Sequence, residues 1–214
     1  MIIAIDGPSG SGKSTLGRML ARELKLLYLD TGSMYRAVAL AVIEAQVDPN
    51  DKESVVALAN RIEIDLQGDP DSLSVLLNGR DVTEQIRSES VTEMSSIVST
   101  IPGVRRAMVE RQRAMGKRGA VLNGRDIGTV VFPDADVKFF LTAVAEERAE
   151  RRYKEAHSGT YAETLADMIE RDRRDSTRAD SPLKVADDAV VIDSTGKDIE
   201  QVFAEMMTYV HRHN

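Results

Sequence analysis

The feature that most constrains this chain is a glycine-rich stretch near its N-terminus, Gly7-Pro8-Ser9-Gly10-Ser11-Gly12-Lys13-Ser14. It fits the pattern G-x-x-x-x-G-K-[S/T] at every position. A short apolar run, residues 2–5, precedes it, and leucines at helical spacing follow it at Leu16, Leu20 and Leu24. The sequence therefore predicts a strand, a phosphate-binding loop (P-loop) and a helix in direct succession.

The chemistry of such a loop follows from its backbone. Glycines allow successive N–H groups to point at phosphate oxygens, and the N-terminus of the following helix adds partial positive charge. Lys13 is placed to reach the β- and γ-phosphates, and the Ser14 hydroxyl to ligate Mg²⁺. We predict a nucleoside triphosphate site here; the alternative is a glycine-rich turn without a ligand.

The P-loop alone does not distinguish a kinase from a GTPase or a motor ATPase. The guanine-recognition pattern Asn/Thr-Lys-x-Asp is absent from the sequence, and the nearest apolar strand ending in an acid, residues 190–193, lies late in the chain. A small-molecule kinase needs a second anion site facing the first, because two phosphate-bearing substrates must meet in line.

Apolar runs and helical stretches alternate along most of the chain. Strands are expected at residues 2–5, 26–29, 120–122, 137–141 and 189–192. Helices are expected at residues 13–24, 33–45, 102–115 and 146–156, then after a break at residues 157–159 to about 175, and at 199–210, with Ser33 capping the second. Short apolar strands alternating with helices indicate a parallel sheet covered on both faces, so we predict an α/β fold of the P-loop NTPase type.

One segment departs from this order. Residues 62–66 and 73–77 alternate apolar and polar side chains around the turn Gly68-Asp69-Pro70-Asp71, which predicts an antiparallel hairpin. Asn78-Gly79 next along the chain favours positive φ and a second tight turn. We therefore expect residues 62–98 to form a small inserted subdomain within one domain of residues 1–214.

Polar side chains follow two of the predicted strands and form the candidate second site. Thr31 and Arg36 come after one strand, and Asn123-Gly124-Arg125-Asp126-Ile127-Gly128 after another. Ligands of open α/β sheets bind at the carboxyl ends of strands, and a guanidinium matches phosphate oxygens bidentately. An ordinary strand-to-helix loop is the alternative. The tetrapeptide Asn-Gly-Arg-Asp also occurs at residues 78–81, where we interpret it as a turn, so context must decide.

Two arginine-rich stretches, residues 148–152 and 171–178, flank a break at His157-Ser158-Gly159. Paired helices of this kind predict a lid over residues 148–178 that closes on phosphates, brings arginines to the developing charge and excludes water. The alternative is an exposed helical hairpin held by salt bridges with the intervening glutamates.

Composition limits the partners. A formal charge of −7 makes the chain a poor binder of duplex nucleic acid, and the absence of Cys excludes disulfides and thiolate zinc sites. No run approaches the roughly 20 apolar residues of a membrane span, and the start lacks a signal-peptide pattern. We expect a cytoplasmic monomer with no membrane or nucleic-acid partner.

Several motifs in the same order closely resemble those of bacterial cytidylate kinases, a family of nucleoside monophosphate kinases. They are residues 5–14, 29–36, 124–135 and 171–179, followed by Pro182-Leu183. The resemblance implies transfer of a phosphoryl group from ATP to CMP or dCMP, with Mg²⁺, giving ADP and CDP or dCDP. It also implies that residues 62–98 belong to the monophosphate-binding region.

The resemblance implies a role for each matching residue. ATP would be held by Gly7, Pro8, Ser9, Gly10, Ser11, Gly12, Lys13, Ser14, Thr15 and Arg148. Cytosine would be met by Ser96, Arg105 and Asp126, the monophosphate by Thr31, Arg36, Arg125 and Arg178, and the sugar by Arg171 and Asp175. Lys13, Arg125, Arg151 and Arg178 would act in catalysis, with Arg148, Arg151 and Arg152 as the lid arginines.

These roles suit the cytosine ring. A carboxylate such as Asp126 accepts a hydrogen bond from the exocyclic amine, while Arg105 and Ser96 donate to N3 and O2. Uracil replaces the amine with a carbonyl, which a carboxylate repels, and a site built for one pattern rejects the other. Two other hypotheses remain: a different small-molecule P-loop kinase, and a regulatory nucleotide-binding module without turnover.

Overall fold

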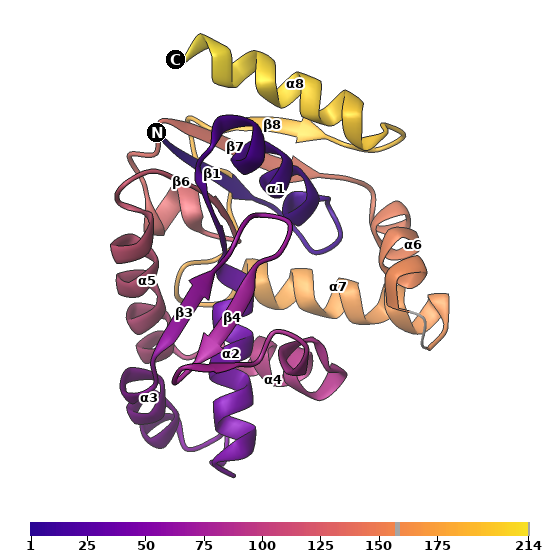
Figure 1. The fold of residues 1–214 in the computed structure, drawn as a ribbon. Helices are drawn as coiled ribbons and strands as arrows, with labels where there is room; N and C mark the ends of the chain where they lie inside the picture. Colours follow the sequence, from indigo (N-terminus) through magenta and orange to yellow (C-terminus); the bar gives the residue numbers. More distant parts are fainter. Residues whose placement is uncertain (157–158, 214) are drawn as a thin grey trace.

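The computed structural model describes residues 1–156 and 159–213. Its centre is a parallel sheet of strands β1 (Ile2–Asp6), β2 (Leu27–Asp30), β6 (Ala120–Asn123), β7 (Val137–Thr142) and β8 (Val190–Asp193). The strand order is β2-β6-β1-β7-β8, so the strand that leads into the P-loop lies in the middle (Figure 1). The predicted α/β fold is confirmed.

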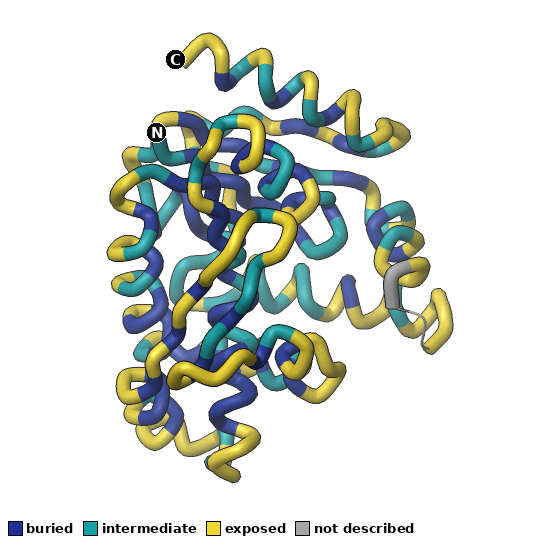
Figure 2. The backbone as a smooth tube through the Cα atoms, viewed as in Figure 1, coloured by how far each residue is buried: buried dark blue, intermediate teal, exposed yellow. Residues whose placement is uncertain are grey.

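Alternation along the strands divides the core into two clusters. Ile3 and Ile5 of β1 are buried with Leu16 and Leu20 of helix α1 (Lys13–Leu24) and with the apolar side of helix α8 (Ile199–Arg212). Ala4, between them, faces the opposite cluster with helices α2 (Thr31–Glu44) and α5 (Pro102–Gly116). Each face of the sheet is therefore covered, as a parallel sheet requires, and β1, β6 and β7 are mostly buried (Figure 2).

Helix α2 begins earlier than the sequence suggested. The cap is Asp30, whose carboxylate accepts a hydrogen bond from Gly32 N at 3.1 Å, and Thr31 is the first helical residue. The prediction of Ser33 as the cap was wrong, because Asp30 stands at the end of β2 and reaches the free N–H groups first. The Ser33 hydroxyl instead donates to the carbonyl of Asp30.

The expected hairpin is present and has a third strand. Strands β3 (Ile64–Gln67), β4 (Ser74–Leu77) and β5 (Arg80–Asp81) pair antiparallel in that order. Asn78 and Gly79 between β4 and β5 have φ of 51° and 77°, which confirms the predicted turn. A 3₁₀ helix (Gln85–Arg87) and helix α4 (Glu89–Val98) complete residues 62–98.

This region is joined to the core and not separate from it. Leu66 and Val75 of the hairpin and Val91 and Val98 of α4 are buried in the same cluster as α2 and the sheet. Helix α3 (Lys52–Arg61), which the sequence analysis did not predict, packs against α5 at the edge of that cluster.

Helices α6 (Ala145–Ala156) and α7 (Tyr161–Thr177), which contain most of the segment predicted as a lid, pack on each other beside the sheet (Figure 1). Gly159, the last residue of the predicted break, has a φ of 75°; His157 and Ser158 lie outside the described residues. Thr160 caps α7 through a reciprocal arrangement with Glu163. No helix within residues 1–156 and 159–213 is both long and apolar enough to cross a membrane.

Candidate active site

The P-loop runs from the end of β1 to the start of α1, as predicted. Its glycines adopt backbone conformations that side chains disfavour: φ is 145° at Gly7 and 73° at Gly10. A Cβ on Gly7 would lie 2.0 Å from the carbonyl oxygen of Leu141, so the loop passes directly over the end of β7. The glycine pattern is therefore required by backbone packing as well as by phosphate access.

Lys13 lies folded under this loop. Its Nζ donates to the carbonyl of Pro8 at 2.6 Å, and its side chain is buried. Burial, and then the positive charge of Arg125, lower the pKa of Lys13 well below its ordinary value. Lys13 belongs to the P-loop and Arg125 to the loop after β6, and the two positive charges repel each other. An anion placed between them would therefore be stabilised.

Asn123, the last residue of β6, joins β2 to the first turns of α1 and α2. Its side-chain amide donates to Ser14 Oγ at 3.1 Å and to the Tyr28 hydroxyl at 2.7 Å. Its carbonyl accepts a hydrogen bond from Thr31 Oγ1 at 2.8 Å. The sequence analysis placed residues 123–128 in the candidate second site but gave Asn123 no role of its own; its position at the carboxyl end of a central strand was the available signal for this role.

Asp126 lies between two guanidinium groups. Arg105, on α5, forms an ion pair with it, and both side chains are almost fully buried. Arg178 Nη2 lies 3.6 Å from the other carboxylate oxygen. The ring of Tyr35 lies 5.4 Å from the Arg105 guanidinium carbon and supports it from α2. The structure thus brings together three residues from distant segments that the sequence assigned to base and phosphate recognition.

A second acid organises the neighbouring arginines. Arg125 Nε donates to Asp175 at 2.8 Å, and Arg178 Nη1 lies 3.7 Å from the same carboxylate. Burial opposes ionisation of Asp175, but Arg125, Arg178 and Arg171 together outweigh it and hold the pKa of that carboxyl below its ordinary value. Asp175 therefore fixes the direction of two cations that were predicted to hold a phosphate.

Arginines outnumber the acids that pair with them around Arg125. Burial, followed by Arg125, lowers the pKa of Arg171 to about 10, and Arg36 contributes to the same shift. Arg36 pairs with Asp30 at 3.1 Å. Yet the buried Arg36 Nε and Arg178 Nη2 have no hydrogen-bond partner among the described residues. Unpaired buried donors at a cluster of arginines fit an anionic ligand.

Ser96 lies partly exposed on α4, which packs against α2. Its neighbour Ser95 is buried and donates to the carbonyl of Thr92. Of the two serines, Ser96 is thus the one with surface to offer a ligand. Within residues 1–156 and 159–213, no hydrogen bond joins Ser96 to Asp126, and its place at the base stays a prediction.

The predicted lid arginines separate in the structure. Arg148 is buried and donates to the carbonyls of Ala143 and Ser9 and to Asp172. Arg151 donates to the side chain and carbonyl of Ser194, after β8, at 3.1 and 3.0 Å. Arg152 is exposed on α6. In this conformation Arg148 contacts the P-loop, and Arg151 contacts the turn that follows β8.

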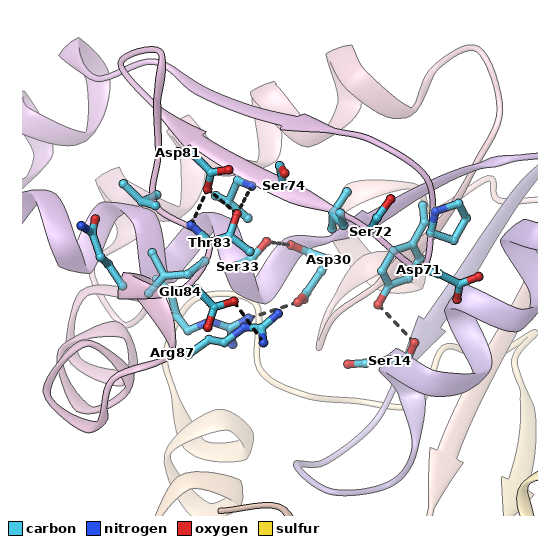
Figure 3. Close-up of a pocket in the computed structure, with 18 of the residues that line it drawn as sticks. Ser14, Asp30, Ser33, Asp71, Ser72, Ser74, Asp81, Thr83, Glu84 and Arg87 are labelled. Atoms are coloured by element: carbon cyan, nitrogen blue, oxygen red, sulfur yellow. Dashed lines mark hydrogen bonds and ion pairs between the residues drawn. The ribbon is translucent and has the colours of Figure 1, made fainter.

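A cavity of about 580 Å³ opens beside Ser14 and Arg36, between the start of α1 and α2 and the hairpin region (Figure 3). Figure 3 shows Asp30 and Ser33 in the middle of the view, with Asp81, Thr83 and Arg87 to the left of them and Ser14, Asp71 and Ser72 to the right. The cavity therefore joins the P-loop to residues 62–98 at the phosphate end of the candidate site.

Fold and site together define a P-loop nucleoside monophosphate kinase, because a triphosphate loop and an acid-bearing arginine cluster meet at adjoining strand ends. The cytidylate kinase family model matches residues 3–212, and the chain belongs to that family. The family and the names of its members support the predicted phosphorylation of CMP and dCMP.

Three curated relatives, each called cytidylate kinase, illustrate the match. The protein of Citrifermentans bemidjiense is 49% identical, over 98% of this chain and 92% of its own. That of Desulforamulus reducens is 50% identical, over 98% and 96%. That of Pasteurella multocida is 43% identical, over 100% and 96%. A solved structure of an uncharacterised protein from Eubacterium ventriosum aligns with a TM-score of 0.55 at 11% identity, covering 99% of this chain and 98% of that one, a likeness of fold alone.

Proposed function

We propose that this chain transfers the γ-phosphoryl group of ATP to CMP and dCMP, with Mg²⁺, forming ADP and CDP or dCDP. One observation carries the proposal: Arg125 and Asp126 are consecutive. Arg125 is close enough to Lys13 of the P-loop to lower its pKa, while Asp126 is buried against Arg105. A single loop thus links the place of phosphoryl transfer to a hydrogen-bond acceptor suited to cytosine.

Phosphoryl transfer depends on positioning and on stabilising charge more than on covalent chemistry. Lys13 would neutralise the β- and γ-phosphates, and Thr15 and the other residues of the P-loop would bind them through backbone N–H groups. Arg36, Arg125 and Arg178 would hold the acceptor phosphate, with Thr31 nearby. Arg151 would reach the transferring group after moving from Ser194.

When cytosine binds, its hydrogen bonds would replace part of the contact that Asp126 now makes with Arg105 and Arg178. Asp126 is held by Arg105 and Arg178 in the structure. The cytosine amine would donate to Asp126, and Arg105 and Ser96 would donate to N3 and O2. Arg171 and Asp175 would lie on the sugar side. Desolvation makes a mismatch costly, because uracil leaves a buried carboxylate facing a carbonyl.

The residues present fit Mg²⁺ of the kind that P-loop enzymes use. Mg²⁺ prefers oxygen ligands and is commonly held by one or two protein groups together with substrate phosphates. Asn123 donates to Ser14 Oγ and orients it, leaving a lone pair for the ion. The ion would supply charge neutralisation between the β- and γ-phosphates.

We further propose that residues 62–98 form the monophosphate-binding insert and that residues 148–178 form the lid. We also propose that the protein works in the cytoplasm as a monomer, without nucleic-acid or membrane partners. Size-exclusion chromatography with light scattering measures the oligomeric state. A dimer at micromolar concentration would contradict the monomer.

A coupled assay of ADP release with CMP, dCMP, UMP, AMP and shikimate tests the activity. We expect CMP and dCMP to be the best acceptors, and turnover to require Mg²⁺. Equal or faster turnover of UMP or shikimate would overturn the cytosine assignment. Saturable ATP binding with no acceptor-dependent ADP would instead indicate a regulatory module.

A further inference from the structure

Both polar backbone groups of one P-loop residue, Ser9, are bound by the lid helices. The N–H of Ser9 donates to Asp172 Oδ1, on α7, at 3.3 Å. The carbonyl of Ser9 accepts from Arg148 Nη1, on α6, at 2.8 Å. Arg148 and Asp172 are themselves paired at 2.7 Å, so the three residues form a closed set, named here the Ser9 clamp.

The Ser9 clamp is tightly packed. The Arg148 side chain is 8% exposed and that of Asp172 is 20% exposed. The next loop residue, Gly10, lies so near that a Cβ there would be 2.9 Å from the Arg148 carbonyl oxygen and 3.0 Å from Met168 Cε. α6 and α7 therefore rest directly on the P-loop backbone, and the loop conformation depends on where these helices lie.

Helix α7 also carries residues of the acceptor site. Arg171 is next to Asp172 in the sequence. Asp175 lies three residues after Asp172, which places the two acids side by side on the surface of one helix. Asp175 binds Arg125 at 2.8 Å. A ligand that holds Arg125 and Arg171 would therefore fix the same helix that presents Asp172 to Ser9.

We propose that Asp172 is a positioning residue that couples the two substrate sites, so that acceptor bound against α7 tightens triphosphate or diphosphate binding at the P-loop. This inference rests on the proposed function. Coupling of binding is reciprocal, so the nucleotide at the P-loop must tighten the acceptor by the same factor. The Asp172 carboxylate acts through its contacts with Ser9 and Arg148.

Equilibrium titrations measure this coupling without turnover. A fluorescent ADP analogue is titrated with and without saturating CMP, and CMP is titrated calorimetrically with and without ADP. For the unaltered protein we expect each ligand to tighten the other within the usual range of about 5- to 150-fold. In Asp172→Ala we expect the factor to fall to about one.

Two further variants separate positioning from loss of structure. Asp172→Asn keeps an oxygen for the Ser9 N–H but loses the charge for Arg148, and we expect intermediate coupling. Asp167→Asn changes an exposed acid on the same helix and should leave coupling intact. A purely structural defect would weaken both ligands without changing the ratio that defines coupling.

Wild-type coupling in Asp172→Ala, or an uncoupled unaltered protein that binds both ligands, would overturn this inference and leave the proposed function standing. Failure of the unaltered protein to bind CMP at all would overturn both.

Discussion

The Asp6 carboxylate accepts a hydrogen bond from the backbone N–H of Gly128 at 2.8 Å, across 122 positions of sequence. The other oxygen accepts from Ile127 N at the same distance. The last residue of β1 thereby fixes the loop that presents Arg125 and Asp126, immediately before the P-loop begins. One buried acid thus joins the start of the P-loop to the loop that carries the proposed acceptor-binding residues.

That acid should make stability depend on pH. Burial, although opposed by the two backbone hydrogen bonds, raises the pKa of Asp6 from 3.8 to about 6. The folded protein binds the Asp6 proton more tightly than the unfolded chain does. The contribution of Asp6 to the free energy of unfolding is therefore greatest below about pH 4 and is lost as the pH rises from about 4 to about 6. It amounts to roughly 3 kcal/mol across that interval.

Urea unfolding of the unaltered protein and of Asp6→Asn from pH 4 to 7 measures this effect. The unaltered protein should lose stability relative to the variant as the pH rises. A difference between the two that does not change with pH would show that Asp6 titrates normally.

Lys13→Ala should suppress phosphoryl transfer. The ammonium group would neutralise charge that develops between the β- and γ-phosphates, and loss of one such donor lowers kcat by roughly 10²- to 10³-fold. The coupled assay measures the change, with Lys52→Ala, an exposed lysine on α3, as the control. Near-normal turnover of Lys13→Ala would refute its catalytic role.

Asp126→Ala should reduce use of CMP more than binding of ATP. Loss of the acceptor leaves the amine and Arg105 without a buried partner, and we expect kcat/KM for CMP to fall by roughly 10²-fold or more. The KM for ATP should change much less. Comparable losses for both substrates would contradict a role at the base.

Asp81→Ala is a matched control, because Asp81 ends the same tetrapeptide in the hairpin region. It bonds to Thr83 there, and its replacement should leave the ratio of CMP to UMP turnover unchanged.

Gly10→Ala should damage the protein beyond the cost of its backbone conformation. Gly10 and Gly196 have φ of 73° and 68°, so alanine at either position incurs a similar left-handed penalty of about 1–2 kcal/mol. Only at Gly10 does the new methyl meet Arg148 and Met168; nothing lies within 4 Å at Gly196. We expect Gly10→Ala to be less stable than Gly196→Ala by about 1–3 kcal/mol in urea unfolding. Equal losses would show that the lid helices yield to the methyl group.

Local patterns predicted the sheet, the P-loop and the hairpin because each depends on neighbours in sequence. The glycine motif, the alternation of residues 62–77 and the positive φ of Asn78 are of this kind. Helix α3 was missed although Asp51 caps it by accepting from Ser54 N, because the preceding cluster of Asp, Pro and Asn indicated only a loop.

Roles that depend on distant partners were less accessible. Asp172 was one acid among several in a charged helix, and only the position of α7 on the P-loop reveals its contact with Ser9. Asp6 likewise looked like the end of a strand. Arg148 was assigned to ATP by resemblance, whereas the structure surrounds it with protein carbonyls and Asp172. Sequence indicates which side chains are available, and tertiary packing decides which of them are already engaged.

The hairpin and α4 share one continuous apolar cluster with α2, α5 and the sheet. Residues 62–98 therefore are not a detachable module. Deleting them would expose the apolar sides of α2 and the sheet to water, and the isolated segment would have too little interior to fold. A shorter relative of this fold would need a different α2 surface, so gain or loss of the segment must have required coordinated changes in the core.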